Sequence, residues 1–397
     1  MQKIAMLGSG FIGRFYAESI HGQRGRDRVV AIYARREESA KKFADDYGCS
    51  FWATDMEEVI AHSDVTMVCI ALPNNLHETA VMLCVKHKKA LVSTKPLGRN
   101  SAEALRMMQA VEEAGIFGGY LEDLCYTPKF LKAKQMVDNG ALGRILWAKS
   151  RETHPGPHSN WFWDKEMAGG GCILDLGCHC IEIARNFIGK DIKPVEVMCW
   201  AATQVKPIEA EDHAIALVKY ENGAIGQFEV SWTFRGGMDL RDEVMGTEGT
   251  IWMNNFLRTG FEVFTTGKGG DYVAEKAESN SGWLFPVGDE VNELGYNHMF
   301  TDMFRSVEEG QEPAETLYDG YVVNAIIDAA YKSAQSKLWE PVILPVWRGQ
   351  EGLKPVSTLV DYDADYYLIK EEVTHDGRHK VILKDKKTNE IIERDLK

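Results

Sequence analysis

Hydrophobic and polar positions in the first 122 residues alternate between the periods of buried strands and of amphipathic helices. The apolar runs that predict buried strands are residues 1–7, 29–33, 65–71, 90–93 and 116–120. Helical spacing lies between them, with Gly48 ending one predicted helix and Asn100 and Glu103 forming a capping box before another. Strands that alternate with helices in this way predict an α/β Rossmann domain with a doubly wound parallel sheet.

The pattern changes beyond residue 122, and strands dominate after Pro194. The turn at Glu221-Asn222-Gly223 joins two runs of alternating apolar and polar residues, which predicts an open antiparallel sheet with one face covered. The other predicted elements are a helix at 128–140, a strand at 145–151, and closing helices near 290–309 and 317–336. Helices and strands that are segregated in this way predict an α+β domain.

Residues 351–397 are polar and strand-like, with turns near His375-Asp376-Gly377 and Asn389. They predict a C-terminal β meander, which is marginally stable alone. We therefore expect it to pair with another subunit of a homo-oligomer or to cover the core. The predicted domains are a dinucleotide-binding domain at 1–122, a substrate-binding domain at 123–350 and the β extension at 351–397.

Composition narrows the class of protein. The chain has 397 residues, of which 45% are hydrophobic and 26% charged, as in ordinary globular proteins. No apolar run reaches the roughly 20 residues that span a bilayer and the N-terminus lacks a signal-peptide pattern, so we expect a cytoplasmic protein without a membrane partner. The net charge of -14 disfavours nucleic acid as a partner. The eight cysteines are scattered through apolar segments, as reduced core thiols are.

Residues 8–13, Gly8-Ser9-Gly10-Phe11-Ile12-Gly13, form a GxGxxG motif directly after the first predicted strand. Gly8 permits a tight turn, Gly10 lets a pyrophosphate approach the backbone, and Gly13 lets the next helix pack closely on the strand. The N-terminus of that helix supplies an anion site. In this strand-to-helix context the motif predicts dinucleotide binding, with Phe11 and Ile12 beside the cofactor.

The second predicted strand ends in Tyr33-Ala34-Arg35-Arg36, where an NAD-specific site usually has an acid that binds the ribose 2′-hydroxyl. Arg35 and Arg36 instead suit a 2′-phosphate, which favours NADP. Alternatively, both arginines are solvated, or one stacks on the adenine while NAD binds. The sequence therefore places Ala34, Arg35 and Arg36 at the cofactor and leaves NAD(H) and NADP(H) both open.

The segment Gly169–Cys180, which reads GGGCILDLGCHC, holds two titratable side chains in an apolar run. If the segment is helical after its glycines, Asp175 and His179 lie one turn apart on one face, where the carboxylate can orient the imidazole. A purely structural polar pair would have the same spacing. Cys178 and Cys180 do not predict a metal site, because no second pair of ligands follows at zinc-site spacing.

Several segments together resemble the Gfo/Idh/MocA family, named for glucose-fructose oxidoreductase, inositol dehydrogenase and rhizopine catabolism, over about residues 1–345. They are GSGFIG, ALPNNLH, STKPLG, GGGCILDLGCHC, and the late region from Gly310 to Ala314 with DGYVVNAIIDAAYKSA after it. The resemblance implies a Rossmann domain, a second domain with a large, mainly antiparallel sheet, and oxidation or reduction of a sugar or cyclitol alcohol. It also implies that the loop of Leu72, Pro73, Asn74 and His77 lies on the nicotinamide side.

By the same resemblance, Lys95 matches the family's catalytic lysine, and Asp175 and His179 match its acid and histidine. Oxidation of a secondary alcohol needs a base for the hydroxyl proton and a cation for the forming alkoxide. We expect His179 to be the base, Lys95 to be the cation beside the cofactor, and Asp175 to fix the histidine tautomer. The sequence departs from the family twice: Thr94 replaces the usual Glu, and the acidic LEDLCYTP predicts an unusual substrate pocket.

Aromatic and polar residues complete the predicted substrate site, which comprises Tyr126, His158, Trp161 and Trp163 together with Lys95, Asp175 and His179. The favoured substrate is a sugar or glycoside, with oxidation of the C3 hydroxyl of a plant O- or C-glycoside to a 3-keto-glycoside by tightly bound cofactor. The alternatives are an inositol or sugar dehydrogenase with exchangeable cofactor, an NAD-dependent glycosidase and a non-catalytic cofactor-binding sensor.

Overall fold

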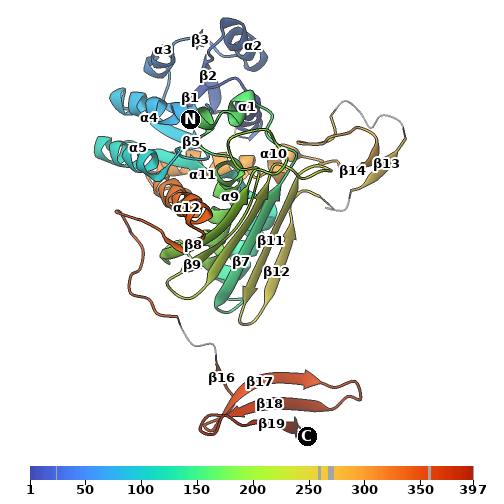
Figure 1. Ribbon diagram of the computed structural model, residues 1–397. Coiled ribbons are helices and arrows are strands. Elements are labelled where there is room, and N and C mark those ends of the chain that lie inside the picture. The colour runs from blue at the N-terminus through green and yellow to red at the C-terminus, as the bar shows by residue number, and fades with distance from the viewer. Residues whose placement is uncertain (24, 258–260, 267–271, 356–358, 397) are drawn as a thin grey trace. The chain divides into compact units, whose positions relative to one another are not determined.

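The N-terminal part of the chain folds into a six-stranded parallel sheet (Figure 1). Its strands are β1 (Lys3–Leu7), β2 (Arg28–Tyr33), β3 (Phe51–Ala53), β4 (Met67–Ile70), β5 (Ala90–Thr94) and β6 (Gly118–Leu121), in the order β3-β2-β1-β4-β5-β6. The connecting helices are α1 (Phe11–Gln23), α2 (Glu37–Tyr47), α3 (Met56–Ala61), η1 (Asn74–Leu76), α4 (His77–Lys86) and α5 (Ser101–Ala114). The doubly wound Rossmann sheet is therefore confirmed. The computed structural model describes residues 1–23, 25–257, 261–266, 272–355 and 359–396.

Local sequence explains where these helices begin and end. The Asp55 side chain accepts a hydrogen bond from the amide of Glu58 and caps α3, and Gly48 ends α2 in the left-handed conformation. Asn100 caps α5 by accepting from the Glu103 amide. The predicted capping box is only half formed, because the Glu103 carboxylate accepts from the backbone amide of Arg99.

The second part of the chain forms a seven-stranded mixed sheet. Its strands are β7 (Ile145–Thr153), β8 (Pro194–Ala202), β9 (His213–Tyr220), β10 (Ile225–Ser231), β11 (Asp239–Gly246), β12 (Thr250–Asn254) and β15 (Glu340–Pro341), in the order β12-β11-β7-β10-β9-β8-β15. Only β7 and β10 pair in parallel, so the expected mainly antiparallel sheet is confirmed. A short hairpin of β13 (Val263–Thr265) and β14 (Gly282–Leu284) extends from the main body, as Figure 1 shows.

Helices cover one face of the seven-stranded sheet. The helical elements of this part are η2 (Asp123–Tyr126), α6 (Pro128–Asp138), η3 (Asn160–Trp163), α7 (Lys165–Ala168), α8 (Cys172–Asp175), α9 (Gly177–Ile188), α10 (Glu290–Glu293), α11 (Tyr296–Glu309) and α12 (Leu317–Ser336). Helix α9 packs on β7 and β10, and α12 packs on β8. Along β9, Ala214, Ala216 and Val218 are buried while Ile215 on the other face is exposed, as the alternating pattern predicts.

Two predicted helices are interrupted. The helix expected to run through Asp175 and His179 breaks at Leu176, between α8 and α9. The helix expected at 290–309 breaks at Gly295, whose φ is +85° and where a Cβ would lie 2.3 Å from the Asp123 carbonyl oxygen. Among the described residues, no single helix has the length and apolar composition to cross a bilayer; Lys165–Asp175 and Gly177–Ile188, bent by 41°, meet that test only as a pair.

The C-terminal residues form a compact unit of their own, Lys354–Lys397, while Met1–Leu353 form another that contains both large sheets. The C-terminal unit is a four-stranded antiparallel sheet whose small core includes Val381 and Leu383. Its strands are β16 (Val360–Asp361), β17 (Tyr366–Val373), β18 (His379–Asp385) and β19 (Ile391–Leu396). A meander was expected here; the boundaries at 122 and 350 stay predictions.

A buried ionic cluster joins α9 to α12. The Lys190 Nζ lies 2.9 Å from the Glu315 carboxylate and 3.1 Å from that of Asp319. It also lies 3.2 Å from Glu182, which pairs with the fully buried Arg185. Because buried carboxylates persist only when they are paired, the Lys190 ammonium holds these acids together with Arg185, which also lies 3.5 Å from Asp319.

We predict that Lys190→Met lowers the free energy of unfolding by about 3 kcal/mol, the usual cost of breaking a buried ion pair. Lys190→Arg keeps the charge and serves as the control. Urea denaturation followed by circular dichroism measures both variants. A K190M protein as stable as K190R would contradict the role given to this lysine.

Candidate active site

One cavity of about 680 Å³ brings most of the predicted site residues together. It lies at the carboxyl ends of β1, β2, β4 and β5 and is closed by residues around β7 and α9. The predicted residues that line it are Gly8, Gly10, Phe11, Ile12, Ala34, Arg35, Arg36, Leu72, Pro73, Asn74, Lys95, His158, Trp161, Asp175 and His179. Residues assigned to the cofactor and residues assigned to the substrate therefore share one continuous space.

Two residues predicted to contact the cofactor lie outside this lining. Gly13 faces the turn, where a Cβ would lie 2.2 Å from the Gly8 carbonyl oxygen, so it serves the close packing that the motif predicts and does not itself line the cofactor space. His77 is fully buried, with its Nε2 2.9 Å from the Leu72 carbonyl oxygen and its Nδ1 3.1 Å from that of Pro96. This corrects the prediction for His77, which ties the ALPNNLH loop to the segment after β5.

Two residues predicted to contact the substrate also point elsewhere. Tyr126 is 3% exposed, and its hydroxyl donates to the Asp302 carboxylate at 2.9 Å, because η2 turns this side chain towards α11. Trp163 packs edge-on against Trp232, with ring centroids 5.3 Å apart. Neither side chain lines the cavity.

The glycines of the first turn shape the cavity beside the N-terminus of α1. Gly8 has a φ of +114°, and a Cβ there would lie 2.2 Å from the Ala71 carbonyl oxygen, so only glycine fits. A Cβ at Gly10 would meet no atom within 4 Å and would project into open space. That space lies where a pyrophosphate reaches a helix N-terminus, so these residues fit a bound dinucleotide.

Lys95 and Asp175 form a buried ion pair between the end of β5 and α8. The Lys95 Nζ donates to Asp175 Oδ1 at 2.9 Å and to the Asp175 carbonyl oxygen at 2.7 Å. The other carboxylate oxygen, Oδ2, accepts from Trp232 Nε1 at 3.1 Å. Burial acts against both charges, but Lys95 lowers the pKa of Asp175 to about 2, and Asp175 holds the pKa of Lys95 well above its usual value. Both side chains stay charged at neutral pH.

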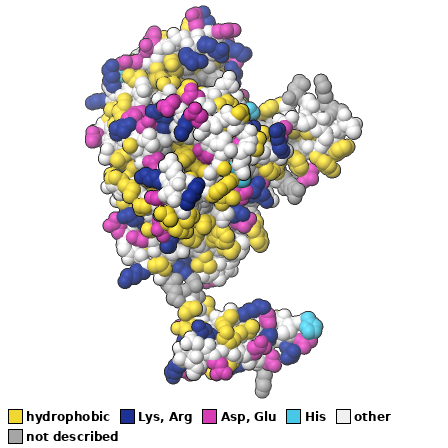
Figure 2. All heavy atoms as spheres, in the orientation of Figure 1, with side chains coloured by type: hydrophobic (Ala, Val, Ile, Leu, Met, Phe, Trp, Pro, Cys, Tyr) yellow, Lys and Arg dark blue, Asp and Glu magenta, His cyan; other side chains and the backbone are white. Residues whose placement is uncertain are grey.

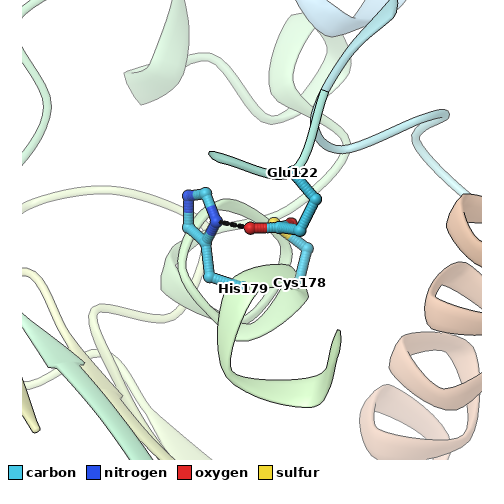
Figure 3. A group of neighbouring side chains, drawn as sticks. All are labelled: Glu122, Cys178 and His179. Carbon is cyan, nitrogen blue, oxygen red and sulfur yellow. Dashed lines mark hydrogen bonds and ion pairs between the residues drawn. The ribbon is translucent and has the colours of Figure 1, made fainter. Parts of the chain in front are cut away.

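His179 is held by Glu122 and not by Asp175. Figure 3 shows the hydrogen bond between His179 Nδ1 and Glu122 Oε1, which comes from the residue after β6. The prediction that Asp175 orients the histidine is therefore wrong: the break at Leu176 separates the two residues, and the carboxylate turns to Lys95. Burial and the charge of Lys95 lower the pKa of His179 to about 3, so its imidazole is neutral at physiological pH.

Cys178 completes the group drawn in Figure 3, in which ligand-type atoms of Glu122, Cys178 and His179 lie within 4.8 Å of one another. The Cys178 thiol donates to the Asp175 carbonyl oxygen at 3.1 Å, and burial raises its pKa well above its usual value. A metal needs the thiolate, whereas this thiol stays protonated and the other two groups bind each other. These three residues do not fit a metal.

Three buried acids were missed by the sequence reasoning as individual site residues. Burial raises the pKa of Glu122 to about 8 and that of Asp123 to about 7, and it raises the pKa of Glu152 on β7 well above its usual value. Asp123 and Glu152 line the cavity. Glu122 and Asp123 directly follow β6, the neighbour of β5, so their position at the carboxyl edge of the sheet was a usable signal. Glu152 gave none.

Part of the cavity lining is aromatic. Trp161 and Phe162 both line it and stack on each other, with ring centroids 3.7 Å apart and planes inclined by 23°. His158 packs against Phe11, with ring centroids 4.9 Å apart. His154 is 2% exposed, and its Nδ1 accepts a backbone amide at 2.9 Å, which leaves Nε2 for the cavity. The substrate end thus combines flat apolar surfaces with a few polar groups.

Two family models match the chain over both sheets. Residues 2–118 match the oxidoreductase family with an NAD-binding Rossmann fold, and residues 130–252 match the GFO/IDH/MocA C-terminal domain. The chain belongs to the Gfo/Idh/MocA family. It is therefore an oxidoreductase with an NAD-binding domain, which confirms the resemblance of the sequence motifs and the predicted class of enzyme.

Curated relatives and solved structures agree with this assignment. The levoglucosan dehydrogenase of Pseudarthrobacter phenanthrenivorans is 26% identical over 77% of this chain and 86% of its own length. The myo-inositol 2-dehydrogenase of Thermotoga maritima is 27% identical over 84% of this chain and 97% of its own length. The crystal structure of GenD2 from gentamicin A biosynthesis, in complex with NAD, has a TM-score of 0.81 at 28% identity and covers 87% of this chain and 97% of its own.

Gly10→Ala is predicted to weaken NAD binding at least tenfold, because the new methyl group would occupy the space where the pyrophosphate approaches the helix. Stability should be unchanged, since that methyl group meets no protein atom within 4 Å. Gly22→Ala, in the helix α1 that follows Gly10 and equally free of contacts, is the control. Calorimetric titration of cofactor-free protein measures the affinity; equal affinities of G10A and G22A would contradict the placement.

Proposed function

We propose that this protein is an NAD-dependent dehydrogenase that oxidises a secondary ring hydroxyl of a sugar or glycoside. The observation that carries the proposal is the position of Lys95, Asp175 and His179, which line the cavity between its glycine-rich and aromatic ends. The relatives named levoglucosan dehydrogenase and myo-inositol 2-dehydrogenase support a substrate with ring hydroxyls. Relatives in complex with NAD or NADH support the choice of cofactor.

The roles of the residues follow from their contacts. His179 Nε2 is the ring nitrogen not bound to Glu122, so it takes the proton of the substrate hydroxyl. The Lys95 ammonium donates two of its N–H groups to Asp175, and its third N–H can donate to the forming alkoxide. Asp175 keeps that ammonium charged and in place. Bound NAD supplies the hydride acceptor.

Within this class, we propose a glycoside oxidised at C3 to a 3-keto-glycoside, with NAD kept bound between turnovers. The stacked pair of Trp161 and Phe162 supports this choice, because it gives the cavity a flat aromatic surface suited to a sugar ring or a planar aglycone. The cavity of about 680 Å³ is also within the range that holds small molecules of this size.

Incubation of the purified protein with methyl and 4-nitrophenyl β-D-glucopyranoside, levoglucosan and myo-inositol tests the reaction. We expect mass spectrometry to show a glucoside product lighter by two hydrogens, and cofactor released from denatured protein to be NAD. Replacement of His179 by Ala should lower kcat about 10²- to 10⁴-fold, the usual contribution of a general base, with cofactor still bound. Release of 4-nitrophenol would indicate a glycosidase, and no keto product from any probe would contradict the proposal.

We further propose that the protein is a homo-oligomer. Two surfaces support this: the uncovered face of the seven-stranded sheet exposes Trp147, Trp200 and Trp252, and the C-terminal unit exposes Val373 and Ile391. Figure 2 shows hydrophobic side chains among interspersed acidic and basic ones on one face of the protein. Exposed apolar groups of this kind favour subunit contacts.

Light scattering of three proteins tests the assembly: the full chain, a chain without residues 351–397, and a Trp147→Glu/Trp252→Glu variant. We expect the full chain to exceed the mass of one subunit, and each change to reduce that mass, because each removes apolar contact area. A full chain with the mass of one subunit would contradict the oligomer. A truncated chain with unchanged mass would contradict the role of the C-terminal unit.

A further inference from the structure

His179 has a buried carboxyl group, that of Glu122, as the partner of its Nδ1. Glu122 is fully buried and His179 is 4% exposed, and the Nδ1–Oε1 hydrogen bond joins them behind the cavity. A base that takes a proton at Nε2 becomes an imidazolium unless it gives up its other proton. Burial and the nearby ammonium of Lys95 both disfavour that charged form. The site therefore needs a second acceptor behind the imidazole.

We propose that Glu122 is a positioning residue that fixes the orientation of His179 and takes the Nδ1 proton as Nε2 receives the proton of the substrate. This inference rests on the proposed function, and it assigns Glu122 the place that sequence reasoning gave to Asp175. The geometry carries it, because Nδ1 has the Glu122 carboxylate as its hydrogen-bond partner and Nε2 is the nitrogen that remains for the cavity.

The step balances in atoms and charge. The substrate O–H bond breaks and its proton forms a bond with Nε2, while the Nδ1–H bond breaks and that proton forms a bond with Glu122 Oε1. The hydrogen on the substrate carbon leaves with both bonding electrons for the acceptor that NAD supplies, and the carbonyl forms. His179 is neutral before and after, having changed tautomer, and Glu122 changes from carboxylate to carboxylic acid. The reverse sequence reduces a ketone.

The surroundings of Glu122 Oε2 support the inference that this carboxyl group changes its protonation state. Oε2 is buried without a side-chain partner among the described residues, and a hydrogen bond from the Leu124 backbone amide lowers the pKa of the carboxyl group. Burial raises the pKa of Glu122 to about 8, which places both of its forms within reach at neutral pH.

Other titratable groups set the environment of the pair. The cations are Lys95, which lowers the pKa of Glu122, and Lys190, which acts in the same direction. The carboxyl groups near the Glu122–His179 pair are Asp123, Glu152, Asp175 and Glu182. The thiols and the phenol near the pair are Cys125, Cys178, Cys180 and Tyr120. Of these, the Glu182 carboxylate raises the pKa of Glu122.

The two directions of the reaction need opposite protonation states of Glu122. Oxidation needs the Glu122 carboxylate, so its rate should rise as the pH rises through about 8. Reduction needs the carboxylic acid, so its rate should fall over the same range. Other dehydrogenase steps also depend on pH, and the variants below separate their effects from that of Glu122.

Glu122→Gln removes the ionisation and keeps the size of the side chain. Glu182→Gln is the matched control, because Glu182 is also fully buried, lies one turn along α9 from His179 and does not line the cavity. The first readout is the rate of NADH formation in a single turnover of the NAD-loaded enzyme with 4-nitrophenyl β-D-glucopyranoside. The second, without substrate, is the infrared C=O band of protonated carboxyl groups as a function of pH.

We expect E122Q to lose about 10²-fold in rate, together with the rise through about pH 8, and to lack one titrating C=O band. E182Q should keep the high-pH rate and that band, with the midpoint moved to lower pH. Circular dichroism and NAD affinity establish that both variants fold.

An E122Q enzyme within twofold of the wild-type rate, or with an unchanged pH profile, would overturn the inference. A wild-type spectrum in which no band titrates through this range would also overturn it. If the wild-type enzyme oxidises no probe, the proposed function fails, and the infrared band alone decides whether Glu122 changes its protonation state.

Discussion

The ion pair between Lys95 and Asp175 is the constraint on which the arrangement of the site depends. Lys95 directly follows strand β5 of the parallel sheet, and Asp175 ends α8, 80 residues further along the chain. Because the Asp175 carboxylate is buried and the Lys95 side chain is only 19% exposed, each charge depends on the other for its stability. The pair therefore fixes the cofactor-binding edge of one sheet against the helix that covers the other. It also explains the break at Leu176: a continuous helix would not let Asp175 face Lys95 and His179 face Glu122 together.

The site combines a pair of side chains that stay charged with a second pair that tends towards its neutral forms. Lys95 and Asp175 keep their charges, with Trp232 completing the shell of the carboxylate. His179 and Glu122 are pushed towards their neutral forms by burial, and the ammonium of Lys95 adds to this effect on the histidine. A fixed positive charge beside an uncharged base suits the removal of a proton from a hydroxyl whose oxygen becomes negative.

Much of the fold was accessible from the sequence, because buried parallel strands read as apolar runs and half-covered strands alternate. The GxGxxG turn, Lys95 and the Asp175–His179 segment also stood out by position and resemblance. Strand β3, of three residues, was too short to give a pattern. The orientation of Asp175 was not predictable, since the apolar residues on both sides of Leu176 fit a continuous helix and the competing partner is distant in sequence. His77 and Trp163 were misplaced because buried polar and aromatic residues next to a site resemble those within it.

Transfer of deuterium from a defined carbon tests the central claim most directly. The measurement is the mass of reduced cofactor recovered after a single turnover with 4-nitrophenyl β-D-glucopyranoside deuterated at C3. If the ring hydroxyl at C3 lies between Lys95 and His179 beside the nicotinamide, the recovered NADH should carry one deuterium, and the labelled substrate should react more slowly than the unlabelled one. Unlabelled NADH, or an unreduced cofactor with intact glucoside, would contradict that claim.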